Sequence, residues 1–157
     1  MMKGLRGRLI ATYVIVVAVS MVTLGAYLLD SLRAYHVEQL RLQLRAQALL
    51  AADIARPSLC VSDQTNGSAQ FLATQLAQRT GVRITIIARD GTVLGDSHQI
   101  PSTMENHANR PEFTDALATG FGFSTRRSAT LGTSMMYVAV RVEGEGGVGG
   151  VVRVALP

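Results

Sequence analysis

The 157-residue sequence contains only one cysteine, Cys60, and only one lysine, Lys3. A single cysteine cannot form an intrachain disulfide or a site with several thiolate ligands. We therefore expect Cys60 to be a small buried thiol, with an intermolecular disulfide as the alternative. A protein-kinase core needs a lysine on its third strand together with HRD and DFG motifs, and the sequence has neither motif. HExxH and GxSxG motifs are also missing, so no standard zinc or serine hydrolase site is indicated and we expect no catalytic residues.

The sequence has no cluster of basic residues with interleaved aromatic residues, although its formal net charge is +4. Three of the fifteen basic residues are Lys3, Arg6 and Arg8, at the N-terminus. The remaining twelve face eleven acidic residues, which leaves a net charge of +1 for the rest of the chain. We therefore do not expect a nucleic acid as a partner.

Leu9–Leu29 is a run of twenty-one residues without a charge. As a helix it would be about 30 Å long, which is the thickness of the hydrocarbon core of a bilayer. The basic residues before it predict that residues 1–8 are cytoplasmic and that residues 30–157 lie outside the cytoplasm. A cleaved signal peptide is the alternative, but its apolar region would be shorter and Gly25-Ala26-Tyr27 is a poor cleavage site. We therefore predict an uncleaved transmembrane helix.

Asp30–Arg56 has no glycine or proline and is rich in helix-forming residues, and Pro57 follows it. These features predict a long helix that ends at Arg56 and is continuous with the transmembrane helix. Two apolar stripes run along it, and the first follows heptad positions with Gln47 as its only polar member. The first stripe comprises Val37, Leu40, Leu44, Ala51 and Ile54, and the second comprises Leu32, Tyr35, Leu42, Ala46, Leu49 and Leu50. One stripe can pack on the domain and the other on a second copy, and we assign the first to a homodimer. Alternatively, both stripes form one wide surface that faces the core.

The remaining sequence alternates between helical and strand patterns. Pro57–Ser68 is predicted to be a polar loop with a turn at Asn66-Gly67, and Ser68 to cap the next helix. The predicted helices are Ala69–Arg79 and Pro111–Thr119, and the predicted strands are Val82–Ala88, Thr92–Asp96, Gly122–Ser128, Ser134–Val142 and Gly150–Leu156. Asp90-Gly91 is predicted to be the tight turn of the first hairpin. The order predicts an α+β fold, in which a five-stranded antiparallel sheet carries packed helices.

The segment Gly144–Val151 matches the GxGxxG pattern of nucleotide-binding loops. Such a loop must open a helix whose N-terminus meets the phosphates, whereas the residues that follow here have a strand pattern. We therefore predict a hairpin turn.

The polar loop Ser97–Arg110 and the two predicted strands Gly122–Ser128 and Ser134–Val142 contain the candidate site residues. His98, Glu105 and His107 match no standard metal-binding spacing, so we expect no metal. Arginines are suited to bidentate binding of a carboxylate or phosphate. The candidate residues for an anion site are Arg110, Arg126, Arg127, Tyr137 and His107. The alternatives are surface salt bridges, for example between Arg110 and Glu112 or Asp115, and a core position for Tyr137.

Four segments in the second half of the chain carry a resemblance to a known family. They are ARDGTVLGDS (88–97), PSTMENHANRPEF (101–113), ATGFGFSTRRSATLGTSMMYVAV (118–140) and GGVVRVALP (149–157). From Ile86 onward, the chain resembles the extracytoplasmic PAS-like sensor domain, of single Cache/PDC type, of PhoR-like bacterial sensor histidine kinases. The resemblance implies that residues 57–157, together with the helix 30–56, form a PAS-like sensor domain outside a bacterial inner membrane.

The resemblance also implies what the chain does and what accompanies it. In the family, a second membrane span, a HAMP or PAS module, a phosphoacceptor-histidine helix and an ATP-binding domain follow the sensor. ATP, Mg²⁺ and a response regulator are therefore expected only through those parts, and no cofactor is expected in this chain. His36 lacks the HExP context of a phosphoacceptor. The expected partners are the membrane, a second copy of the chain, and a small ligand or an extracytoplasmic protein.

We therefore predict the sensory input region of a two-component sensor histidine kinase, which passes its signal through the helices of Leu9–Arg56. A ligand that changes how the sheet packs on the long helix would shift or rotate it. The alternatives are the input domain of a chemoreceptor or of a cyclic-dinucleotide enzyme, because PAS-like ectodomains are interchangeable. A membrane-anchored interaction or scaffold protein is a further alternative.

Overall fold

The computed structural model describes residues 4–60, 66–127, 132–144 and 147–156. The chain divides into two compact units, Met1–Leu40 and Arg41–Pro157. Helix α1 (Leu5–Cys60) contributes residues to both units. The side chain of Cys60 and the last residue of the predicted strand Gly122–Ser128 lie outside the described residues, so the predictions for them stay predictions.

The first unit consists of the N-terminal part of α1, whose large apolar side chains are exposed. The hydroxyl groups of Thr12, Ser20 and Thr23 donate hydrogen bonds to backbone carbonyls three or four residues earlier. In an apolar solvent, the polar groups of a helix must form hydrogen bonds within the helix, because no water is present to bind them. Among the described residues, one helix, at Arg6–Pro57, is long and apolar enough to cross a membrane. Its insertion into a membrane stays a prediction.

One boundary of each of the first two helices in the second unit differs from the sequence prediction by three or four residues. Helix α1 does not end at Arg56 but continues through Pro57 to Cys60. A proline removes one backbone donor, and one turn from the end of a helix this loss does not stop the last residues from remaining helical. Helix α2 (Asn66–Thr80) starts at Asn66, so the predicted turn at Asn66-Gly67 and the predicted cap at Ser68 are wrong. Asparagine is itself a preferred residue at helix starts.

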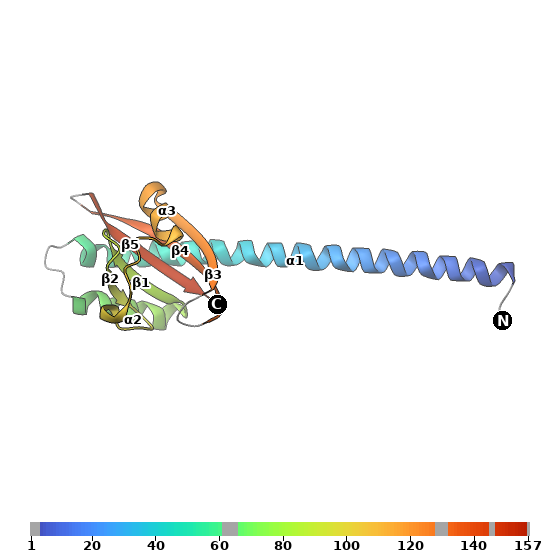
Figure 1. Cartoon of the computed structure of the whole chain (residues 1–157), viewed down its shortest axis with the longest axis horizontal. Helices are drawn as coiled ribbons and strands as arrows, with labels where there is room; N and C mark the ends of the chain where they lie inside the picture. Colours follow the sequence, from blue (N-terminus) through green and yellow to red (C-terminus); the bar gives the residue numbers. More distant parts are fainter. Residues whose placement is uncertain (1–3, 61–65, 128–131, 145–146, 157) are drawn as a thin grey trace. The chain divides into compact units, whose positions relative to one another are not determined.

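The sheet has five antiparallel strands in the order β2-β1-β5-β4-β3 (Figure 1). The strands are β1 (Arg83–Ala88), β2 (Val93–Asp96), β3 (Phe121–Arg127), β4 (Ser134–Gly144) and β5 (Gly147–Leu156). The short 3₁₀ helix η1 (Pro101–Thr103) and helix α3 (Pro111–Thr119) connect β2 to β3. The predicted α+β fold, a hairpin followed by a three-stranded meander, is confirmed.

The first predicted hairpin turn is found. The second hairpin is also found, but its turn is shorter than the predicted Gly144–Val151 because β5 already begins at Gly147, and residues 145 and 146 lie outside the described residues. At the first, Gly91 has a φ of 87° and the Asp90 carboxylate accepts a hydrogen bond from the backbone N–H of Thr92. Glycine adopts this left-handed conformation without the penalty that a Cβ atom imposes. At the second, β4 and β5 stay paired as far as Gly144 opposite Gly147. The glycine-rich segment therefore joins two strands and opens no helix.

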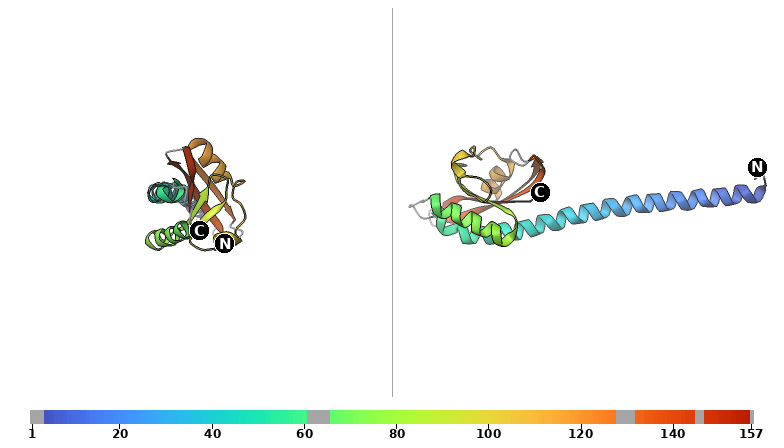
Figure 2. Two further views of the ribbon diagram at one scale, coloured as in Figure 1. Left: turned by 90° about the vertical axis from the view of Figure 1, so that its left-hand side faces the viewer. Right: turned by 90° about the horizontal axis from the view of Figure 1, so that it is seen from below.

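The two faces of the sheet have different covers. Helix α2 and residues of α1 from Leu44 to Leu59 cover one face, whereas α3 and the loop after β2 lie on the other (Figure 2). Strand alternation divides β5 accordingly: Val152 and Val154 belong to the core under α1 and α2, whereas Arg153 faces the opposite side. The main core thus lies between the sheet and α1 and α2.

The two apolar stripes of α1 have different environments. In the second unit, Leu44 and Ala51 of the predicted dimer stripe are buried in the core of their own domain, whereas Ile54 is exposed. Val37 is exposed in the first unit, and Leu40 is 37% exposed. The second stripe is exposed along its whole length, at Leu32, Tyr35, Leu42, Ala46, Leu49 and Leu50. The alternative of one wide core-facing surface is therefore wrong, because only one side of the helix packs on the domain. The sheet of the same chain covers Leu44 and Ala51, so these two residues do not lie on a surface that a second copy could contact.

Candidate functional site

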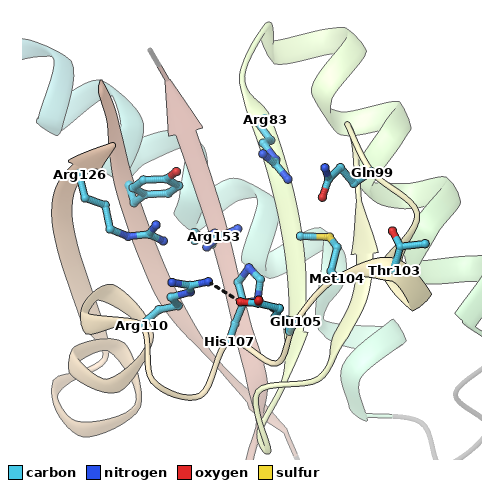
Figure 3. Close-up of a pocket in the computed structure, with 10 residues that line it drawn as sticks. Arg83, Gln99, Thr103, Met104, Glu105, His107, Arg110, Arg126 and Arg153 are labelled. Carbon is cyan, nitrogen blue, oxygen red and sulfur yellow. Dashed lines mark hydrogen bonds and ion pairs between the residues drawn. The ribbon is translucent and has the colours of Figure 1, made fainter. Parts of the chain in front are cut away.

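A small cavity of about 170 Å³ lies on the face of the sheet that carries α3. Figure 3 shows the side chains around it, with Arg110 and Arg126 entering from one side, Arg83 from the other, and Arg153 between them. The cavity is lined by Arg83, Gln99, Thr103, Met104, Glu105, His107, Arg110, Arg126, Tyr137 and Arg153. We call it the arginine pocket.

A row of polar side chains crosses three neighbouring strands at the base of the arginine pocket. The sheet register places Thr85 of β1 opposite both Asp96 of β2 and Arg153 of β5. Thr85 Oγ1 donates to Asp96 Oδ2 at 2.8 Å and accepts from Arg153 Nη2 at 3.1 Å. Arg83 Nε contacts both Asp96 oxygens, at 3.1 and 3.2 Å. The carboxylate of Asp96 therefore pairs with the guanidinium charge of Arg83.

Glu112 provides the second buried carboxylate, in the first turn of α3. Pro111 at the first helical position is a favoured helix start. Glu112 Oε1 accepts from Arg126 Nη2 at 2.8 Å and from Arg153 Nη1 at 3.3 Å. Burial opposes the ionisation of Glu112. Three effects outweigh burial and lower the pKa of Glu112: the hydrogen bond from Arg126, a hydrogen bond from the backbone of Glu112 itself, and the positive charges of Arg153 and Arg126. One carboxylate oxygen thus serves two guanidinium groups.

Tyr137 of β4 supports the same two arginines through its ring. The guanidinium carbon of Arg126 lies 4.1 Å from the ring centroid and that of Arg153 lies 5.1 Å from it. Both distances are within the range of cation–π attraction. Tyr137 is buried, so it both fills the core and lines the arginine pocket.

Arg110 differs from the other three arginines in its counter-ion. Its Nη2 atom lies 3.4 Å from Glu105 Oε2, and the Glu105 side chain is 87% exposed. An exposed ion pair at this distance contributes little free energy. Arg110 is therefore the arginine of the pocket that can change partner at the lowest cost.

His107 is buried at the edge of the arginine pocket and is held by its loop. Its backbone N–H donates to Gly91 O at 2.8 Å, and its Nδ1 atom lies 2.7 Å from Glu105 O. Because a carbonyl can only accept, Nδ1 carries the proton. Burial and then the positive charge of Arg153 lower the pKa of His107 to about 4. The imidazole is therefore neutral at pH 7, and its Nε2 atom is an acceptor.

Three atoms of this cluster are buried and have no hydrogen-bond partner among the described residues: Arg126 Nε, Arg153 Nε and Glu112 Oε2. A buried polar group without a partner is costly, so its retention calls for an explanation such as a bound ligand or water. Two of the three atoms are donors on positively charged groups, and both arginines line the arginine pocket. The arrangement is suited to an anion that accepts several hydrogen bonds.

Four of the five predicted site residues, Arg110, Arg126, Tyr137 and His107, meet in the arginine pocket. Arg127 is the exception: it is exposed, and its Nε donates to Gly132 O at 2.7 Å. Adjacent residues of a strand point to opposite faces, so Arg126 and Arg127 cannot both reach one pocket. Their roles in binding stay predictions. The expected salt bridge of Arg110 to Glu112 or Asp115 is not the one found, since Arg110 pairs with Glu105.

Sequence reasoning missed Arg83, Arg153 and the two buried carboxylates, Asp96 and Glu112. The signal was a single charge inside an otherwise apolar strand, in VRITIIA and in GVVRVAL. Such a charge is almost never fully buried unless it is paired. Within the part of the chain that the structure describes, no group of three or more His, Cys, Asp or Glu side chains is arranged to hold a metal ion.

Comparison with known proteins identifies the fold. A search of curated protein sequences finds no match. Among solved structures, the sensor domain of the V. cholerae histidine kinase DctB has a TM-score of 0.65 at 22% identity, over 82% of this chain and 52% of that one. The ligand-binding domain of the Campylobacter jejuni chemoreceptor Tlp3, in complex with 4-methylisoleucine, has a TM-score of 0.64 at 17% identity, over 77% of this chain and 52% of that one. The ligand-binding domain of the Pseudomonas fluorescens chemoreceptor CtaA, in complex with L-alanine, has a TM-score of 0.58 at 16% identity, over 76% of this chain and 53% of that one.

The chain spans about half the length of these solved domains. The family model described as Single Cache-like matches residues 48–157, which include every strand of the sheet and every residue of the arginine pocket. The resemblance to a Cache/PDC-type sensor domain is thereby confirmed. The chain belongs to the Single Cache-like family.

Proposed function

We propose that the chain is the extracytoplasmic sensory input region of a membrane receptor and that it binds a small carboxylate-bearing ligand in the arginine pocket. The observation that carries the proposal is the charge balance of this pocket. Four arginines line it, and only two buried carboxylates, Asp96 and Glu112, face them. His107 adds no further positive charge because it is neutral. Two positive charges thus have no buried carboxylate. A ligand carboxylate would neutralise one of them, and its two oxygens match the fork of a guanidinium group.

The size of the pocket and the structural neighbours support a small ligand of this chemistry. At about 170 Å³, the arginine pocket is smaller than the ~300–1,000 Å³ of pockets for drug-sized ligands. The Tlp3 and CtaA domains were solved with amino acids, which carry a carboxylate. In our proposal, Arg110 leaves the exposed Glu105 and pairs with the ligand carboxylate. His107 Nε2 would accept a hydrogen bond from a second group of the ligand.

Strand β3 provides a route from the arginine pocket to α1. One of its faces presents Arg126 to the pocket, and the other presents two phenylalanines to α1. The guanidinium group of Arg41 lies 4.4 Å from the ring centroid of Phe123, and that of Arg45 lies 4.8 Å from that of Phe121. A ligand that binds more tightly to one position of β3 would shift the equilibrium between two positions of α1. The signal would then follow α1 into the predicted transmembrane span.

For the receptor, we propose a sensor histidine kinase that functions as a homodimer, with the second stripe of α1 between the two copies. The stripe supports this because its large apolar residues are exposed. The likeness to the DctB sensor domain supports the kinase. The likeness to the Tlp3 domain supports a second candidate, a chemoreceptor, to the same degree. The reading frame beyond Pro157 discriminates between them, because only the kinase predicts a helix with a phosphoacceptor histidine in an HExP context.

Thermal unfolding of the full chain in lipid nanodiscs tests the ligand class. We expect at least one small carboxylate among acetate, lactate, L-alanine and malonate to raise the melting temperature, because a ligand that binds only the folded state stabilises it. The corresponding amides are the controls, since they keep the shape and lose the charge. If no carboxylate raises the melting temperature above its amide, the proposed ligand class is rejected. Inorganic phosphate in the same series tests whether another anion is preferred.

A further inference from the structure

A second cavity, of about 530 Å³, lies between the start of α2, strand β2 and the loop that follows β2. Its apolar wall is formed by Val93, Ile100, Pro101 and Met104. In contrast to the arginine pocket, its lining contains no charged residue. Its volume lies within the ~300–1,000 Å³ that small-molecule sites occupy. We call it the α2 cavity.

The polar side chains that line the α2 cavity are largely occupied by the protein itself. The amide of Gln70 donates to Asp96 O at 2.9 Å and accepts from Asp96 N at 3.0 Å. Asn106 likewise donates to Asp90 O and accepts from Ala108 N. A ligand in this cavity would therefore meet few free hydrogen-bonding groups, and polar or charged molecules would lose their hydration without compensation.

One large apolar side chain in the wall of the α2 cavity is strongly exposed: Ile100 is 67% exposed. An apolar ligand that covers Ile100 would remove its apolar surface from water, which is favourable.

We propose that the α2 cavity is a second ligand site, which takes an uncharged and mainly apolar small molecule. It is separate in position and chemistry from the arginine pocket. Met104 lines both cavities, so its methyl signal is a probe for a molecule that enters the α2 cavity. The site does not depend on the proposed carboxylate ligand, because none of the four arginines lines it.

Indole is the probe for the test, because it is uncharged and mainly apolar. The full chain, labelled with ¹³C-methyl methionine, is placed in lipid nanodiscs and titrated with indole. We expect the Met104 signal to shift and saturate, whereas the signals of Met21 and Met135 move only to the extent that indole enters the bilayer or changes the solvent. The absence of a saturable shift at Met104 would overturn the proposal.

Gly67→Phe is designed to fill the α2 cavity. A Cβ atom at Gly67 would meet no atom within 4 Å, so the ring can extend from α2 without a backbone clash. We expect this change to weaken indole binding by at least about tenfold. Gln78→Phe, at an exposed position on the same helix, adds the same ring elsewhere and is expected to leave binding unchanged. Equal indole binding in both variants would overturn the proposal.

A second filling variant, Ser102→Phe, enters from the opposite wall of the α2 cavity and repeats the test if Gly67→Phe does not fold. The signals of Met135 and Met136, on strand β4, report whether each variant keeps the fold of the sheet. If a folded filling variant binds indole as tightly as the unsubstituted chain, indole binds elsewhere and the proposed site is rejected.

Discussion

Replacing Glu112 by glutamine tests the buried charge network at the centre of the site. The change keeps the shape of the side chain and removes its charge, which leaves Arg153 buried without a carboxylate. The side chains of Glu112 and Arg153 are 0% and 3% exposed, so water cannot replace the lost partner. Breaking a buried ion pair in this way costs about 3–5 kcal/mol of unfolding free energy. Arg126 adds less to this loss, because its side chain is partly exposed and can reach water.

Urea unfolding of the full chain in lipid nanodiscs, followed by circular dichroism, measures this loss. Glu143→Gln is the matched control: it removes one negative charge from an exposed pair with Arg141, and we expect it to cost about 0–1 kcal/mol. The double variant Glu112→Gln, Arg153→Met also removes the fully buried guanidinium group and should recover a large part of the loss, because the charge that remains, on Arg126, can reach water. If Glu112→Gln costs no more than Glu143→Gln, the account of a buried network is refuted.

Three further predictions concern pH, packing and the helix surface. Folding lowers the pKa of His107 from 6.5 to about 4, so as the pH falls the unfolded chain binds a proton before the folded chain does. The unfolding free energy should therefore fall by up to about 3 kcal/mol from pH 6.5 to pH 4. His107→Gln should remove this contribution to the pH dependence. A Cβ atom at Gly122 would overlap the backbone carbonyl of Glu112, so Gly122→Ala should lower the melting temperature by several degrees, whereas Gly67→Ala, in open space, should not. In a cysteine-free background, a cysteine at the exposed position Leu49 should form a disulfide between two copies in membranes, whereas one at the buried position Leu44 should not.

Each of these three has a result that would contradict it. An equal pH dependence in the chain with and without His107→Gln would show that the histidine is not protonated on unfolding in this range. Equal melting temperatures of Gly122→Ala and the Gly67→Ala control would mean that α3 does not lie directly on β3. Equal crosslinking from positions 44 and 49 would reject a dimer that uses the second stripe of α1.

The fold could be predicted because its signals are local. Apolar alternation in Ser134–Val142 and the Asp90-Gly91 turn are each determined by neighbouring residues. The stripes of α1 could not be assigned in the same way. The two apolar stripes are alike in sequence, and only the position of the sheet decides that Leu44 is buried and Leu42 is exposed. A heptad pattern therefore identifies a surface that packs but not its partner.

Some residues of the arginine pocket could be predicted from the sequence, and others could not. Arg110 and Arg126 stand out in the sequence because they lie near a polar loop. Arg127 is next to Arg126, and only the alternation of side chains along β3 separates the two. The strand alternation places these neighbours on opposite faces. Glu112 could not be assigned a role from sequence alone, because its contacts to Arg126 and Arg153 join residues 14 and 41 positions apart. Only the packing of α3 on the sheet brings them together.

The most direct test of the proposed function is calorimetric titration of the full chain in lipid nanodiscs with the carboxylate that stabilises it most. Arg110→Ala should raise the dissociation constant by about 10–100-fold, because it removes a charge-assisted hydrogen-bond donor of the pocket. Arg127→Ala removes the same charge from the opposite face of β3 and should leave the dissociation constant unchanged. An equal effect of the two substitutions, or none from Arg110→Ala, would contradict a carboxylate held in the arginine pocket.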